Sequence, residues 1–246
     1  MAISLVASGE YKPASGNGYT TGAFDVGSPS LIVVWLAYQG STFPTVSDNK
    51  SNTYTTVTPV SNGFNPDYKY LQAYYAWSSV VGGSDLTFTV SGSGIAASLF
   101  WQSYSGTRTS SDPYVTKTDA AYPYPSSVTQ IQPGAITATS GHLLTIGLND
   151  WIEEETGPTI NSSFTRLNFI DYDQSYSGAD AYKISTGSSD NPTWTSPNTQ
   201  ELMQTMMMEF AAAPVAGGRT LASGRTLASG RTLASGRSLA SSRTLV

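Results

Sequence analysis

The chain has 246 residues, of which 39% are hydrophobic and 11% aromatic, so it can form a substantial core and is not globally disordered. It contains no cysteine and one histidine, which excludes disulfides, thiolate nucleophiles, zinc–thiolate centres and any site that needs two imidazoles. All 17 acidic residues and seven of the 12 basic residues lie at or before Glu209, so this part carries a formal charge of −10. A negative charge of this size disfavours nucleic acid as a partner.

The first residues lack the pattern of an export signal. The apolar run at residues 3–7 is shorter than the apolar stretch of a signal peptide, and no basic residue precedes it. No segment approaches the roughly 18 to 20 apolar residues of a membrane-spanning helix. We therefore expect synthesis in a cytoplasm and no membrane partner.

Strand patterns dominate the chain up to residue 213. Residues 31–38 are apolar throughout, which fits a central strand that is covered on both faces. Within residues 85–91, Leu86, Phe88 and Val90 alternate with polar residues, as in a half-buried strand. Similar candidates follow at residues 54–57, 71–77, 95–104, 144–148, 166–170, 181–185 and 206–210. Turn residues separate these segments, so we predict an all-β body over residues 1–213, an antiparallel β-sandwich of jelly-roll or immunoglobulin-like type.

Four methionines lie in or just before the last predicted strand. In an extended strand, Met203 and Met207 lie on the face opposite Met206 and Met208. If one face joins the core, the other exposes adaptable apolar surface that suits a partner. This pattern predicts a homo-oligomer, with a trimer as one form.

Residues 214–246 form a second segment, an extended tail with the six-residue repeat GRTLAS. The even period keeps Arg, Leu and Ser on one face of an extended chain, but one leucine per repeat is too little apolar surface to order a lone peptide. Three interpretations remain open: a flexible tether, an arm that orders against an acidic partner surface, and a stem formed between subunits. In the second, the partner-binding residues are Arg219, Leu221, Arg225, Leu227, Arg231, Leu233, Arg237, Leu239 and Arg243.

The chain contains no pattern of a catalytic site. His142 begins a predicted strand, and neither a G-x-S-x-G motif nor a phosphate-binding glycine loop occurs. The acidic run at residues 153–155 is typical of a solvated turn, although two carboxylates would suffice for a glycosidase. We therefore predict that the protein is not an enzyme and has no catalytic residue and no cofactor.

Two further features concern binding. Asp171 and Asp173 are spaced like the first ligands of a calcium loop, but Tyr176 replaces the glycine at position six, so an acidic turn is the preferred interpretation. Aromatic residues in turn-rich segments can contact a sugar or a protein, or pack beneath loops. These residues are Tyr114, Tyr122, Tyr124, Trp151, Tyr172 and Tyr176.

Several segments together resemble a family of β-sandwich domains found in phage virion proteins and bacterial surface proteins. They are residues 31–37, 46–54, 73–83 leading into 86–90, 102–106, 135–146 and 204–211. The resemblance covers about residues 25–213 and implies a non-catalytic sandwich used for display, adhesion or particle decoration.

The missing export signal favours a virion over a bacterial surface, because a virion protein is made in the host cytoplasm and released by lysis. The expected function is that of a capsid decoration or cement protein, or of a head fibre, on the virion surface. The expected partners are the major capsid protein or other virion proteins. The alternative is a glycan-binding receptor-recognition (adhesin) module of a tail fibre, with a host glycan as the partner.

Overall fold

The computed structural model describes residues 2–13, 18–40, 42–61, 69–92, 96–122, 126–150, 156–171 and 177–214. All of them lie in one compact unit, Met1–Val215. Their 19 strands form five sheets with antiparallel pairing, which confirms the all-β prediction and agrees with a β-sandwich. No helix in this described part is long and apolar enough to cross a membrane.

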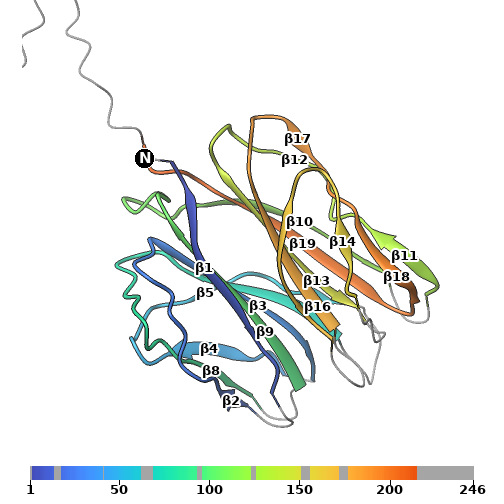
Figure 1. Ribbon diagram of the computed structural model, residues 1–246, viewed down its shortest axis with the longest axis horizontal. Coiled ribbons are helices and arrows are strands. Elements are labelled where there is room, and N and C mark those ends of the chain that lie inside the picture. The colour runs from blue at the N-terminus through green and yellow to red at the C-terminus, as the bar shows by residue number, and fades with distance from the viewer. Residues whose placement is uncertain are drawn as a thin grey trace, which may run out of the picture. The chain divides into compact units, whose positions relative to one another are not determined.

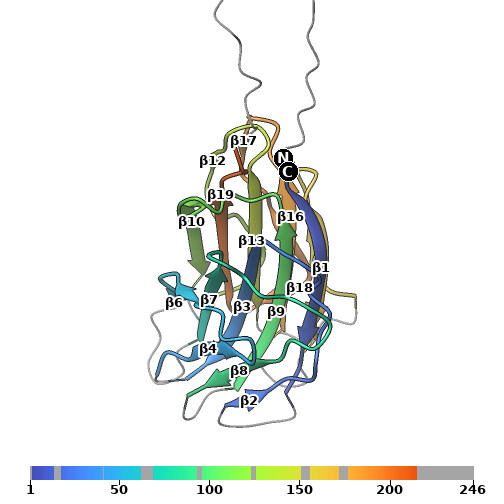
Figure 2. The same cartoon turned by 90° about the vertical axis from the view of Figure 1, so that its left-hand side faces the viewer.

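The first half of the chain forms one large and one small sheet. The large sheet has the order β1 (Ser4–Tyr11), β9 (Ala96–Ser105), β3 (Leu31–Gln39), β7 (Lys69–Ala76) and β5 (Thr55–Thr56), with β6 (Val60–Ser61) also paired to β7. The small sheet has the order β2 (Tyr19–Thr20), β8 (Phe88–Ser91) and β4 (Thr45–Asp48). Figure 2 looks onto this half, with the small sheet in front of the large one. The central strand β3 is covered on both faces, as its apolar sequence predicted.

The second half repeats this arrangement. Its large sheet has the order β10 (Tyr114–Tyr122), β19 (Met203–Phe210), β13 (Leu143–Asp150), β16 (Ser177–Ile184) and β15 (Thr165–Ile170). Its small sheets are β11 (Val128–Ile131), β18 (Trp194–Gln200) and β14 (Thr159–Ile160), and the pair β12 (Ile136–Thr137) and β17 (Ser189–Asp190). In both halves the first strand pairs with the last, and the second pairs with the last but one.

The sheets stack in layers (Figure 1). Three hydrophobic clusters lie between the layers. The inner cluster joins the two large sheets, and it includes Trp35 from β3 and Phe210 from β19. One outer cluster joins the first large sheet to its small sheet through Phe88, and the other joins the second large sheet to β18 through Trp194. The two halves therefore meet through their large sheets, and each large sheet is covered on both faces.

The pairing registers show which residues of the two halves are equivalent. Leu31 and Leu143 begin β3 and β13, and they pair with Tyr104 and Phe210 in the last strands of their halves. In β1 a bulge at Val6 directly follows the residue paired with Tyr104, and in β10 a bulge follows the residue paired with Phe210. Bulges are specific features of a fold, so this shared position indicates a repeated structural unit.

A loop contact is also repeated between the halves. The Asn49 backbone N–H donates to the Thr87 carbonyl at 3.2 Å, and the Asn49 Oδ1 accepts from the Thr87 N–H at 3.0 Å. Asn161 and Thr193 make the same two bonds at 3.3 and 2.8 Å. Thr87 and Thr193 directly precede β8 and β18, the central strands of the two three-stranded small sheets. The two halves therefore share individual side-chain contacts as well as strand order.

The expectation of a free methionine surface is wrong. Met203 and Met207 do lie on the face opposite Met206 and Met208, but all four side chains are 0% exposed. The reason is that β19 belongs to a sheet covered on both sides, by the other large sheet and by β18. The methionines therefore contribute no surface for a homo-oligomer.

Candidate functional site

Most of the binding residues predicted from the sequence lie outside the described residues. These are Tyr124, Trp151, Tyr172, Asp173, Tyr176 and the tail residues Arg219, Leu221, Arg225, Leu227, Arg231, Leu233, Arg237, Leu239 and Arg243. The predictions for them stay predictions. Four other candidates are placed by the structure: Tyr114, Tyr122, His142 and Asp171.

Tyr122 and Asp171 occupy the ends of two strands. Tyr122 is the last residue of β10 and is 41% exposed. Asp171 directly follows β15, and its backbone carbonyl accepts a hydrogen bond from Lys12 Nζ at 2.7 Å. Among the residues that the structure describes, no three His, Cys, Asp or Glu side chains are grouped to hold a metal ion.

His142 has a structural contact. Its Nδ1 lies 2.7 Å from Oε1 of Glu209, a nearly buried carboxylate. The same oxygen accepts the Thr139 backbone N–H at 3.2 Å, and the Thr139 carbonyl accepts the His142 N–H at 3.0 Å. Histidine and carboxylate together hold the turn that precedes β13, in agreement with the interpretation of His142 as a polar residue at a strand edge.

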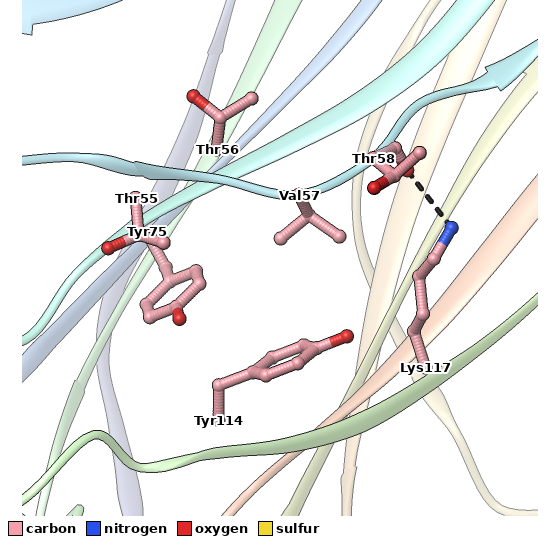
Figure 3. A pocket seen from close by; sticks show the side chains of 7 residues that line it. All are labelled: Thr55, Thr56, Val57, Thr58, Tyr75, Tyr114 and Lys117. Atoms are coloured by element: carbon pink, nitrogen blue, oxygen red, sulfur yellow. Dashed lines mark hydrogen bonds between the residues drawn. The ribbon is translucent and has the colours of Figure 1, made fainter.

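An open pocket of about 210 Å³ lies where β5 and the residues after it face β10 (Figure 3). We call it the threonine–tyrosine pocket, and its lining residues are Thr55, Thr56, Val57, Thr58, Tyr75, Tyr114 and Lys117. The first half supplies five of them and the second half supplies Tyr114 and Lys117. The pocket therefore depends on how the two halves meet.

Two tyrosine rings form the aromatic side of the pocket. The rings of Tyr75 and Tyr114 stack with their centroids 5.6 Å apart and their planes 14° from parallel, and both meet Phe210 edge-on. The Tyr75 hydroxyl donates to Asp112 Oδ2 at 2.9 Å. Burial raises the pKa of both tyrosines, so both hydroxyls remain neutral at physiological pH.

Lys117 closes the other side of the pocket without leaving a free charge. Its Nζ donates to the Thr58 carbonyl at 3.0 Å and lies 2.6 Å from Asp119 Oδ2 (Figure 3 shows the bond to Thr58). The seven lining residues include no carboxylate and no imidazole. The pocket thus offers aromatic surface, threonine hydroxyls and a neutralised cation, which suits a polar uncharged ligand better than an ion or a proton-transfer reaction.

A second pocket, of about 310 Å³, lies where the ends of β1 and β15 meet. Its lining residues are Glu10, Tyr11, Lys12, Phe169, Ile170 and Asp171. Glu10 Oε2 accepts the Phe169 backbone N–H at 2.9 Å, and burial raises the pKa of Glu10. These contacts tie the edges of the two large sheets together.

A polar network crosses the inner core. Gln102 Oε1 accepts the hydroxyls of Tyr104 and Thr145, each at 2.6 Å, and Gln102 Nε2 donates to Asp180 Oδ2 at 2.8 Å. Asn168 donates to Asp180 from its backbone N–H at 2.9 Å and from its side chain at 2.8 Å. Burial raises the pKa of Asp180 to about 7, against the opposing effect of these donors. Asp180 is thus a buried acid between the two halves.

Sequence reasoning identified only part of these sites. It selected Tyr114 because that residue lies in a turn-rich segment, but it missed Tyr75 and the threonines, whose pattern is that of ordinary strands. It also missed Asp180, because its neighbours in the sequence show an unremarkable mixture of polar and apolar residues. Both sites combine residues from distant strands, so no local pattern marks them.

The comparisons with known proteins identify no relative of this chain. No protein-family model, no curated protein and no solved structure matches it. The resemblance to the β-sandwich domains of virion and bacterial surface proteins therefore stays a prediction, carried by the residues named above.

Proposed function

We propose that this protein is a non-enzymatic structural protein of a phage virion, a capsid decoration or cement protein or a head fibre on the particle surface. The observation that carries the proposal is the nested strand order that occurs in both halves. In each half the first strand pairs with the last and the second with the last but one, and further in β3 pairs with β7 as its equivalent β13 pairs with β16. This order supports a jelly-roll type for each half, and jelly rolls are frequent in viral capsid proteins and lectins.

A fold alone does not determine a function, so the proposal also draws on the sequence resemblance. Burial of all four methionines removes one argument for a homo-oligomer. A homo-oligomer, such as a trimer, remains part of the proposal through the repeat tail. Five arginines in that tail suit attachment to an acidic surface of the major capsid protein or of a neighbouring copy.

Quantitative mass spectrometry and electron cryo-microscopy of purified virions test this proposal. We expect a copy number comparable to that of the major capsid protein, and density for the two stacked halves on the outside of the capsid. Deletion of residues 217–246 should lower the occupancy, and so should added salt, because exposed ion pairs are screened. Absence of the protein from purified particles would overturn the proposal.

A second function is favoured by one observation, the threonine–tyrosine pocket. In this alternative the protein is a glycan-binding receptor-recognition (adhesin) module at the tip of a tail fibre, and the pocket receives part of a host glycan. A few copies per particle, located at the tail, would support this function over capsid decoration.

A further inference from the structure

We propose that the threonine–tyrosine pocket binds a single neutral pyranose ring, with Tyr114 and Val57 against the apolar face of the sugar and threonine hydroxyls at its rim. The inference rests on the second function proposed above, glycan recognition, and it names the site and the class of sugar. Figure 3 shows Val57, Tyr75, Tyr114 and Lys117 around the space that the ring would fill.

The first argument is that the two halves differ at this place although their strands correspond. Tyr114 pairs with Phe210 in β19, and the equivalent residue Leu5 pairs with Tyr104 in β9. On the pocket side the edge strand is interrupted. The short strands β5 and β6 together pair with β7 over the stretch where the continuous strand β15 pairs with β16, and the pocket residues Val57 and Thr58 lie between β5 and β6. An interrupted edge strand and a substituted aromatic thus fall together at one pocket. Departures from an otherwise repeated pattern are expected at functional sites.

The second argument is the match between the lining and a sugar ring. A pyranose has a face of C–H groups and a rim of hydroxyls, so it needs an apolar platform and polar partners at its edge. The Tyr114 ring and the Val57 side chain provide apolar surface. Thr55, Thr56 and Thr58 line the pocket, although Figure 3 shows the Thr56 side chain directed away from it. Thr55 and Thr58 are exposed residues, and the Thr55 side chain hydrogen-bonds Tyr75, so hydroxyls at the rim are accessible to a ligand.

The third argument concerns charge. Lys117 is the one cation of the lining, and its ammonium group already contacts Asp119 and the Thr58 carbonyl. The chain up to Glu209 carries a formal charge of −10, which repels anions further. The pocket therefore favours a neutral sugar over a sialic or uronic acid.

Size and openness set the expected affinity. A volume of about 210 Å³ corresponds to about seven water molecules at ~30 Å³ each, which is room for one sugar ring and not for an oligosaccharide. An open pocket with this few atoms in contact binds a free monosaccharide with a dissociation constant on the order of 1 mM. Several copies on one particle would raise the overall affinity through multivalency.

Saturation-transfer NMR on the full chain tests the inference. The probes are the methyl glycosides of glucose, galactose and N-acetylglucosamine, with methyl glucuronide as the charged comparison. We expect saturation transfer to at least one neutral glycoside, with a dissociation constant in the millimolar range, and weaker binding of the glucuronide. In two-dimensional NMR spectra, the largest chemical-shift changes on addition of the glycoside should occur at Tyr114 and at residues 55–58.

Matched variants distinguish the pocket from the rest of the surface. Tyr114→Leu introduces the side chain of the equivalent residue Leu5 and should weaken binding at least tenfold. Thr55→Val should weaken it about threefold, because one hydroxyl is lost from an exposed position. Thr165→Val is the control, since Thr165 pairs with Tyr182 as Thr55 pairs with Tyr75, but in the other half. Circular dichroism verifies that each variant is folded, and Thr55→Val decides the matter if Tyr114→Leu does not fold.

The inference is overturned if none of the neutral glycosides binds at tens of millimolar, if the glucuronide binds most tightly, or if Thr165→Val weakens binding as much as Thr55→Val. These results are independent of location on the particle. A capsid protein that binds no glycoside contradicts the pocket inference alone. A glycoside-binding protein found only at the tail contradicts capsid decoration alone.

Discussion

The two halves of the protein share one strand order but place different side chains where they meet. Trp35 is the fifth residue of β3, and Gly147 is the fifth residue of β13. A Cβ atom on Gly147 would lie 2.6 Å from the Trp35 ring, so these equivalent positions face each other across the inner core. Two large side chains do not fit there. One half therefore carries the tryptophan and the other the glycine.

Other equivalent positions form reciprocal contacts. Tyr75 of the first half meets Phe210 of the second at 5.3 Å between ring centroids. Tyr182, equivalent to Tyr75, meets Tyr104, equivalent to Phe210, at 5.8 Å. Reciprocal contacts of this kind are typical of a two-fold interface between identical subunits. The halves therefore pack like a symmetric dimer. Their side chains differ where the pseudo-symmetry places a residue opposite its own counterpart.

The largest effect is expected when the outer cores are truncated. Phe88 and Trp194 begin the inner strands of the two small sheets, and both are fully buried. Phe88→Ala and Trp194→Ala should each lower the free energy of unfolding by about 3–5 kcal/mol, through lost burial and a residual cavity. Urea denaturation measures both values, with Val115→Ala at an exposed position as the control. A large effect in only one half would show that the two outer cores are not equivalent.

The second prediction concerns Asp180, whose counterpart in the first half is Ala73. Burial raises the pKa of Asp180 to about 7, and it does the same for Asp150. The folded state then binds more protons than the unfolded state between pH 4 and 7. The contribution of these two acids to stability is therefore greatest at low pH and falls as the pH rises through 7, by an amount on the order of a few kcal/mol.

Urea denaturation as a function of pH measures this effect. Asp180→Asn should flatten the decline, whereas Val115→Ala, at an exposed position without a titratable group, should leave it unchanged. A stability that rises steadily from pH 4 to 7 in the unmodified protein would contradict the assignment of Asp180 as a buried acid.

The third prediction addresses the junction itself. Gly147→Ala should lower the free energy of unfolding by about 1–3 kcal/mol, because the added methyl group collides with the Trp35 ring. Gly22→Ala is the matched control, since no atom of the described residues lies within 4 Å of the position that its methyl group would take. In a Trp35→Leu background the Gly147→Ala penalty should shrink. If the loss of stability caused by Gly147→Ala is unchanged in that background, it does not come from the contact with Trp35.

The smallest effect is expected at the repeated loop contact. Asn49→Ala and Asn161→Ala each remove the side-chain acceptor of a backbone N–H, and each should cost about 0.5–1.5 kcal/mol. Asn49→Ala also removes the bond from Asn49 Nδ2 to the Asp85 carbonyl, so its cost should be the larger of the two. Thermal unfolding of the two variants gives the comparison directly. If the two costs differ by more than about 1 kcal/mol, the halves are equivalent in their backbone but not in the stability that this side-chain contact provides.

Local patterns in the sequence predicted the strands well. Residues 31–38 correspond to β3, and Leu86, Phe88 and Val90 are buried as their alternation indicated. Alternation identifies two faces of a strand, but it does not show whether a further sheet covers the second face. For that reason the methionines on one face of β19 were expected at the surface, and those on both faces are instead buried.

The duplication was invisible to the sequence analysis for a related reason. Trp35 corresponds to Gly147, and Ala73 corresponds to Asp180, so the two halves show no repeated sequence at the positions where they meet. Their equivalence resides in strand pairing, which joins residues far apart in the chain. The threonine–tyrosine pocket depends on the same long-range pairing, and only Tyr114 was singled out beforehand.

Residues 106–113 connect the two halves within one polypeptide, so dilution of the protein cannot separate them. A junction between separate subunits dissociates when the concentration falls below its dissociation constant. A short covalent connection instead fixes the effective concentration of one half around the other near the millimolar range, whatever the volume outside. The paired architecture would thus persist at any dilution, including that of a single virion in the function proposed above.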